Sequence, residues 1–193
     1  MRGILDKLIK GQAALTTNNF IEANIKGGRQ YYAFDEATGI PAGESVDYLF
    51  RSGPRKWTDI KFRDVQTSGP NFYVEVYEAP TVSDTGSEQI SVFNWSRPLK
   101  DFRLSGATIW KNPTLTDPGE LIDKDAIYGR DAAAAKNRNG DLNTEGVSRV
   151  LQPDTDYIIR IRNAGEGPES AWIKINWYEG RLVPDPDFLL SHS

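Results

Sequence analysis

The most restrictive feature of this 193-residue sequence is a series of short runs in which apolar and polar residues alternate. The alternation is clearest in the ranges 72–77, 157–162 and 172–177, where apolar side chains occupy every second position. A period of two is typical of strands that bury one face. Turn signals such as Ser52-Gly53-Pro54 and Asn139-Gly140 lie between runs of this kind. The sequence therefore predicts an all-β fold.

The predicted strands indicate an antiparallel β-sandwich of jelly-roll type. The runs supply roughly eight to ten strands at the spacing typical of all-β sandwiches. Helices are not predicted between successive strands, which favours antiparallel pairing over a parallel sheet. A seven-stranded immunoglobulin-like sandwich needs fewer residues than this chain contains, whereas an eight-stranded jelly roll fits the length. The remaining strand candidates are 20–25, 30–34, 46–51, 57–62, 90–95, 107–110 and 148–151.

Three parts are predicted along the chain: an N-terminal docking arm at 1–19, the sandwich domain at 20–180 and a C-terminal tail at 181–193. The arm has an apolar stripe at helical spacing, and its roughly ten residues are too few to form a stable helix alone. An alanine-rich run at 130–136 predicts a second short helix, inside a connection.

Apolar side chains at both ends are candidates for contact with a partner or a neighbouring copy. Their alternative is to fold back on their own domain. These candidate residues are Ile4, Leu5, Leu8 and Ile9 in the arm and Phe188, Leu189 and Leu190 in the tail.

Composition excludes several kinds of catalytic and metal site. Cys is absent and the single histidine is His192, so no Cys nucleophile, disulfide framework or Cys/His zinc site can form. Asp123 and Asp125, followed by Asp131, only loosely resemble a calcium loop, because apolar and aromatic residues stand where a ligand and a glycine belong. Hydrolysis by two carboxylates remains open, with Glu75 as its best candidate. We expect Glu75 to be ordinary sheet surface, and the protein to be no enzyme and to need no metal or cofactor.

The charge balance disfavours nucleic acid and anionic membranes as partners. Lys and Arg total 23 against 27 Asp and Glu, which gives a net charge of −4. Asp6 and Lys7 interrupt the apolar residues at 1–10, so a secretory signal is not expected. No segment has the roughly 18–20 apolar residues of a membrane span. We therefore expect synthesis in a cytoplasm.

The sequence is rich in large aromatic side chains, with five Trp, eight Tyr and eight Phe. Such residues serve sandwich cores and subunit interfaces, and exposed ones can also stack on sugar rings. Trp177 shares a strand face with Ile173 and Ile175, which predicts a core position. Trp172 falls on the opposite face with Lys174 and is the candidate for a contact surface.

Several blocks, in order over about residues 40–180, together resemble small β-sandwich virion proteins of tailed bacteriophages. They are YLFRSGPR at 48–55, VEVYEAPTV at 74–82, VFN at 92–94, Pro113-Thr114 with Thr116-Asp117, LQPDTDY at 151–157, RIRN at 160–163 and WYE at 177–179. The segment 95–100 departs from the pattern, since a more polar, asparagine-rich run is expected there.

The resemblance implies a structural virion protein. Members with a role are similar to head-decoration, or cement, proteins, which sit as trimers on the capsid exterior. By that resemblance the partners are the major capsid (coat) protein and two further copies of this chain, and the location is the capsid surface after synthesis in the host cytoplasm. The alternative is a carbohydrate- or receptor-binding module on the phage tail or head surface, in which exposed aromatics such as Trp172 stack on glycans.

Overall fold

The structure is a computed structural model that describes residues 25–54, 57–127 and 149–180. The predicted arm, the alanine-rich run at 130–136 and the predicted tail lie outside the described residues. The candidate residues in the arm and the tail therefore remain predictions.

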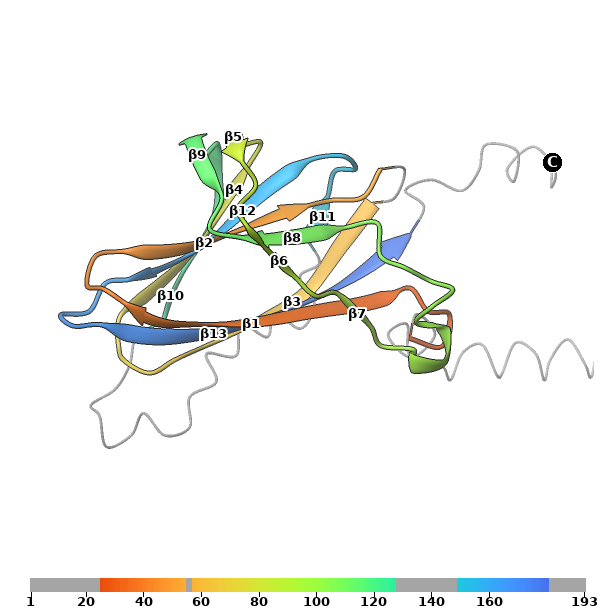
Figure 1. Ribbon diagram of the computed structural model, residues 1–193, viewed down its shortest axis with the longest axis horizontal. Coiled ribbons are helices and arrows are strands. Elements are labelled where there is room, and N and C mark those ends of the chain that lie inside the picture. The colour runs from red at the N-terminus through yellow and green to blue at the C-terminus, as the bar shows by residue number, and fades with distance from the viewer. Residues whose placement is uncertain (1–24, 55–56, 128–148, 181–193) are drawn as a thin grey trace, which may run out of the picture.

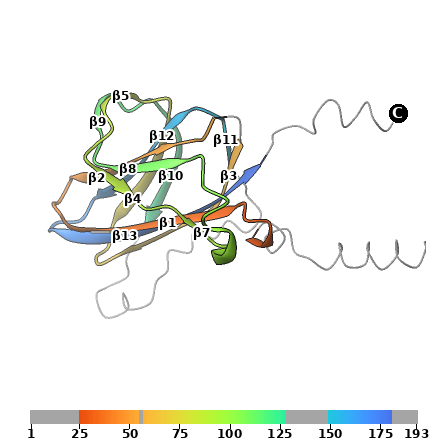
Figure 2. The same ribbon diagram turned by 45° about the vertical axis from the view of Figure 1, so that its right-hand side comes forward.

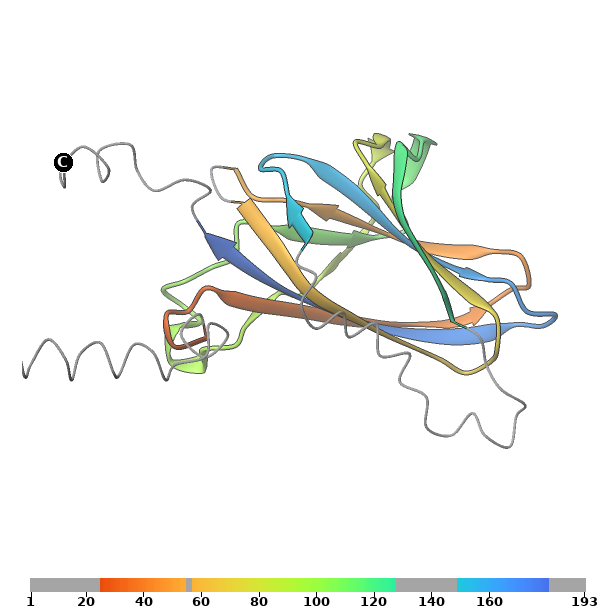
Figure 3. The same ribbon diagram turned by 180° about the vertical axis from the view of Figure 1, so that it is seen from behind.

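Two antiparallel sheets form a β-sandwich-like, all-β fold, as the alternating pattern predicts (Figures 1 and 3). The five-stranded sheet has the order β11 (Arg149–Leu151), β3 (Trp57–Thr67), β13 (Glu169–Gly180), β1 (Gln30–Ile40) and β7 (Phe93–Asn94). The six-stranded sheet has the order β10 (Glu120–Ile127), β4 (Phe72–Glu78), β12 (Asp156–Asn163), β2 (Ser45–Arg51), β8 (Thr108–Lys111) and β6 (Glu88–Ile90).

A third, two-stranded sheet pairs β5 (Thr81–Asp84) with β9 (Thr114–Asp117). It projects from the six-stranded sheet on the side away from the five-stranded one (Figure 2). A single 3₁₀ turn, η1 (Arg97–Leu99), follows β7.

Within the two larger sheets, the first four strands along the chain pair with the last four, taken in reverse order. The pairs are β1 with β13, β2 with β12, β3 with β11 and β4 with β10, and all four are antiparallel. The pairs of β1 and β3 belong to the five-stranded sheet, and those of β2 and β4 to the six-stranded sheet. The chain therefore changes sheet at each connection from β1 to β4.

The core lies between the two sheets and contains the residues that alternate inward. Trp177 is fully buried, as its strand face predicts. Its indole meets the Phe50 ring edge-on at 5.4 Å and stacks on Tyr31 at 6.1 Å. Tyr157 and Ile159 on β12 are also in this core. Burial of such large side chains supplies most of the driving force for folding.

The predicted strand at 90–95 is wrong as a single element. β6 ends at Ile90 in the six-stranded sheet, and β7 begins at Phe93 in the five-stranded sheet. Ser91 and Val92 carry the chain across the edge of the sandwich. A six-residue segment with four apolar residues does not reveal such a crossing, since each half keeps the pattern of a strand.

Two further expectations are corrected. Ile25, the only described residue of the predicted strand 20–25, is helical, and the Gly28 N–H closes the turn on its carbonyl oxygen at 3.0 Å. The acidic segment around Asp123, considered above as a loop, is the strand β10. Strands β5 and β9 are also absent from the predicted set; both are short and largely exposed, and so lack a strong alternating pattern.

Candidate functional site

Trp172 lies on the outward side of β13, opposite Glu36 of β1 and Gln66 of β3. It is half-buried, while its neighbours Ala171 and Ile173 point into the core. Trp172 is therefore on the predicted outer face, and that face is the outside of the five-stranded sheet.

Four aromatic side chains, Tyr32, Phe34, Phe93 and Trp95, form a patch on the same outer face, called here the aromatic patch. Tyr32 lies 5.3 Å from Phe93 and 4.9 Å from Trp95 between ring centroids, and Phe34 lies 5.8 Å from Phe93. Phe34 and Trp95 are exposed. The patch is not among the sites predicted from the sequence, although Tyr32 and Phe34 alternate with Tyr31 and Ala33 in a predicted strand.

Lys174 supplies the positive charge of the aromatic patch. Its ammonium lies 5.2 Å from the Tyr32 ring centroid and 4.9 Å from that of Trp95. Cation–π contacts of this kind stabilise by about 0.5–1 kcal/mol at exposed sites. The Trp95 indole N–H donates to Asn176 Oδ1 at 3.1 Å. The aromatic patch is thus held in one arrangement before any partner arrives.

The chain between β7 and β8, residues 95–107, is called here the β7–β8 loop, and Asn94 fixes its beginning. Asn94 is buried, and its side-chain N–H groups donate to the carbonyl oxygens of Gly28 at 3.0 Å and Arg103 at 2.9 Å. Its side-chain oxygen accepts from the Ser96 N–H at 2.8 Å. One buried amide therefore ties the loop to itself and to the start of the described chain.

Glu179 fixes the end of the β7–β8 loop. This carboxylate is 2% exposed and accepts from the N–H groups of Gly106, at 3.0 and 3.1 Å, and of Ala107, at 3.3 Å. The Trp177 indole N–H also donates to it, at 3.2 Å. A buried carboxylate is tolerated when several donors replace its hydration.

Tyr31 holds the middle of the loop, where its hydroxyl donates to the Leu104 carbonyl oxygen at 3.3 Å. Burial, together with the nearby negative charge of Glu179, raises the pKa of Tyr31 to about 12, although Arg103 acts in the opposite direction. The hydroxyl therefore stays protonated and able to donate at physiological pH.

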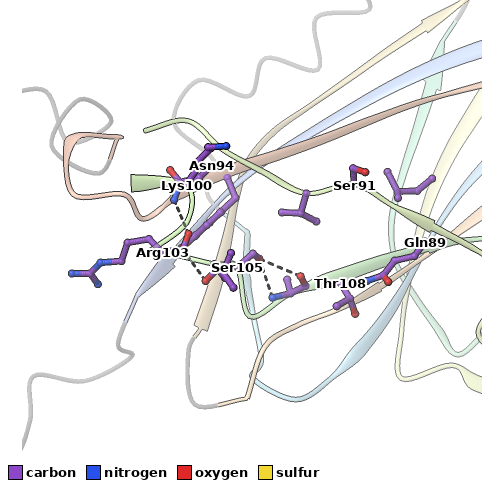
Figure 4. A pocket seen from close by; sticks show the side chains of 12 residues that line it. Gln89, Ser91, Asn94, Lys100, Arg103, Ser105 and Thr108 are labelled. Atoms are coloured by element: carbon purple, nitrogen blue, oxygen red, sulfur yellow. Dashed lines mark hydrogen bonds between the residues drawn. The ribbon is translucent and has the colours of Figure 1, made fainter. Parts of the chain in front are cut away.

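A pocket of about 380 Å³ opens between the β7–β8 loop and the crossing from β6 to β7 (Figure 4). Tyr31, Ile90 and Val92 give it an apolar wall, and Ser91 and Thr108 add hydroxyl groups. Its size is that of a small-molecule site. Arg103 points away from the other labelled side chains in Figure 4, so the pocket gains little positive charge from it.

Glu75 takes part in a network of charged and aromatic side chains on the outer face of the six-stranded sheet. Its carboxylate lies 2.8 Å from Lys124 Nζ and accepts from the Tyr77 hydroxyl at 3.0 Å. Burial raises the pKa of Glu75, but these hydrogen bonds and the charges of Lys124 and Arg162 outweigh it, so the pKa is lowered. A general acid needs a raised pKa, so this environment favours a structural role.

The acidic residues of β10 are bound by arginines. Arg63 Nη2 lies 3.2 Å from Asp125 Oδ2 and also contacts Asp123, and Arg149 Nη1 lies 3.1 Å from Asp123 Oδ2. Within 25–54, 57–127 and 149–180, no group of three His, Asp or Glu side chains is placed to hold a metal ion. Asp131, the third residue of the suggested calcium loop, lies outside the described residues.

No protein-family model matches this sequence, and no curated protein matches it significantly. In the part of the chain that the structure describes, no helix is long and apolar enough to cross a membrane.

Proposed function

We propose that this chain is a structural virion protein of a tailed bacteriophage, which binds the capsid exterior as a trimeric decoration, or cement, protein and stabilises the mature head. The observation that carries the proposal is the set of exposed apolar side chains on β1 and on the hydrogen-bonded β7–β8 loop. Of six large apolar side chains that are exposed among the described residues, four lie on this strand and loop: Phe34, Trp95, Phe102 and Leu104. Exposed apolar side chains that gather on neighbouring parts of the chain mark a candidate interaction site.

We also propose that the sandwich is of jelly-roll type, and the strand order supports this. A jelly roll is a long hairpin rolled into two antiparallel sheets, and viral capsid and lectin domains use this fold. Reverse pairing of β1–β4 with β10–β13 gives that arrangement, with β11-β3-β13-β1 in one layer and β10-β4-β12-β2 in the other. Strands β5 to β9 are then an insertion between the fourth and fifth strands of the roll.

The electrostatics of the outer faces also suit a protein that acts by adhesion. The six-stranded sheet pairs its charges internally: Arg160 binds Asp47 at 2.7 Å and Lys124 binds Glu75 at 2.8 Å. The five-stranded sheet instead exposes aromatic rings. Aromatic side chains are enriched at protein interfaces, and threefold repetition in a trimer multiplies weak contacts through effective concentration.

Binding to capsids tests this proposal. Capsids from a phage deletion mutant that lacks this protein should bind the purified full-length chain saturably, and the loaded heads should resist heat or low salt better than unloaded ones. Cryo-electron microscopy should show added density with threefold symmetry, and light scattering should give a trimer. Virions that contain none of this protein, or capsids that do not bind it at micromolar concentration, would reject the proposal.

The aromatic patch favours one second candidate, a carbohydrate- or receptor-binding module on the tail or head surface. Tyr32, Phe34, Phe93 and Trp95 lie beside the cation of Lys174, and sugar recognition uses aromatic surface together with polar groups. A glycan array separates the two candidates. Saturable binding that is lost in Trp95→Ala or Trp172→Ala supports the second, and an array without signal disfavours it.

A further inference from the structure

The β7–β8 loop presents two large apolar side chains to solvent. Phe102 is 83% exposed and Leu104 is 73% exposed. These are the two highest values among the large apolar side chains in the described ranges. A single exposed apolar residue is ordinary on a protein surface. Two such residues, separated by one position on an anchored loop, form a projecting apolar pair.

The backbone on which this apolar pair stands is fixed by hydrogen bonds. The N–H groups of Phe102 and Arg103 donate to the Leu99 carbonyl oxygen, at 3.1 and 2.9 Å. The carbonyl oxygens of Arg103 and Leu104 accept from Asn94 Nδ2, at 2.9 Å, and from the Tyr31 hydroxyl, at 3.3 Å. Binding through a preorganised loop avoids much of the entropy loss that ordering a flexible segment brings.

The charges of the loop indicate the chemistry of its partner. Residues 95–107 contain the three cations Arg97, Lys100 and Arg103 and the single acid Asp101, in a chain whose net charge is −4. Lys100 and Asp101 form only a long, exposed pair at 3.7 Å. Arg97 and Arg103 have no ion-pair partner within the described ranges, so each can pair with a charge on a partner. The loop is therefore apolar at its tip and positively charged around it.

We propose that the β7–β8 loop is the capsid-facing docking element, and that Phe102 and Leu104 insert into an apolar depression rimmed by carboxylates on the coat protein. This inference rests on the proposed function. Buried apolar anchors surrounded by complementary charges are the usual composition of an interface hot spot. Nucleic acid is the less suitable partner, because three cations release few counterions and the tip itself is apolar.

The experiment compares full-length variants for binding to capsids that lack the protein. Phe102→Ser and Leu104→Ser should each weaken binding about tenfold or more, and the double variant further, as expected for hot-spot residues. Leu121→Ser and Val150→Ser are the matched controls, since these apolar residues are 47% and 51% exposed on β10 and β11, outside the loop. All four side chains are exposed, so unchanged melting temperatures should show that the variants remain folded.

The role of charge is tested with Arg103→Glu in a salt titration. This variant should associate more slowly than the unsubstituted protein at low salt, and the difference should shrink as salt screens the charges. A double-stranded DNA competitor at the same salt should leave capsid binding unchanged. Displacement by that DNA would show that the partner is nucleic acid, and would overturn the inference.

The remaining outcomes separate this inference from the proposed function. Capsids that bind the unsubstituted protein and the Phe102→Ser/Leu104→Ser variant equally well would overturn the inference and leave the proposed function standing. If Leu121→Ser weakened capsid binding as much as Phe102→Ser does, the interface would not be specific to the β7–β8 loop, and the inference would likewise be overturned. Capsids that bind neither the unsubstituted protein nor any variant would reject the proposed function and this inference together.

Discussion

The carboxylate of Glu179 on β13 holds the backbone of Gly106, 73 residues earlier in the chain, with both of its oxygens within 3.1 Å of the Gly106 nitrogen. Gly106 also passes close to Gly53, where a Cβ atom would lie 2.8 Å from the Gly106 backbone. The end of the β7–β8 loop is therefore set by a buried charge and by close backbone packing, and is independent of any partner.

Replacement of Glu179 should release this loop. Glu179→Ala leaves the Gly106 N–H and the Trp177 indole N–H without their acceptor, so the free energy of unfolding should fall by about 2–3 kcal/mol. Urea unfolding measures the change, and hydrogen exchange should accelerate at the amide of Gly106, whereas the Ala107 N–H keeps the Ser105 hydroxyl oxygen as an acceptor at 3.0 Å. Glu120→Gln, at an exposed position on β10, is the control and should leave both measurements unchanged. Slow exchange at the Gly106 amide in Glu179→Ala would contradict this role.

Two phenylalanines distinguish the core from the aromatic patch. Phe50 is fully buried and meets Trp177, so Phe50→Ala should lower the free energy of unfolding by about 3–5 kcal/mol. Phe34 is 48% exposed and stacks on Phe93 in the aromatic patch. Phe34→Ala should therefore lower the free energy of unfolding by only about 1 kcal/mol. Thermal or urea unfolding of both variants makes the comparison. Equal losses would mean that the aromatic patch belongs to the core.

The sequence predicts the regular part of this fold well, because a strand that buries one face leaves a period of two. The strands around Val74, Ile159 and Ile175 follow that pattern and are confirmed. The pattern fails where strands are short or exposed, as in β5 and β9. It also fails at Ser91 and Val92, because a change of sheet is a tertiary event that local periodicity does not record.

The candidate site is harder to predict than the fold. Alternation places Trp172 on an outer face, but the aromatic patch depends on cross-strand register: Tyr32 of β1 meets Phe93 of β7 only because those two residues pair. Likewise, the 73-residue separation of Glu179 from Gly106 leaves no local pattern. Such contacts follow from topology, which single-sequence periodicity does not determine.

Glu75 should make the free energy of unfolding depend on pH in the acidic range. Its pKa is lowered in the folded protein, so its contribution is complete above the unfolded value of about 4.3 and is lost as the pH falls through the folded value. Glu75→Gln should lower the free energy of unfolding by about 1–2 kcal/mol at pH 7, and this deficit should shrink below about pH 4. Urea unfolding from pH 3 to pH 8 measures it, with Glu166→Gln in an exposed loop as the control. A deficit that stayed constant down to pH 3 would exclude the Lys124 pairing as its cause.

Two glycines with positive φ separate backbone strain from steric overlap. Gly39 (φ +66°) has no atom within 4 Å of the position that a Cβ would take, so Gly39→Ala should lower the free energy of unfolding by about 1 kcal/mol through strain alone. Gly119 (φ +87°) lies between β9 and β10, and its Cβ would overlap the Glu78 carbonyl oxygen and lie 2.9 Å from Pro80 N. Gly119→Ala should therefore lower the free energy of unfolding by about 2–4 kcal/mol. Chemical unfolding of the two variants gives the difference, and similar values for both would show that the chain around Glu78 yields to the added methyl group.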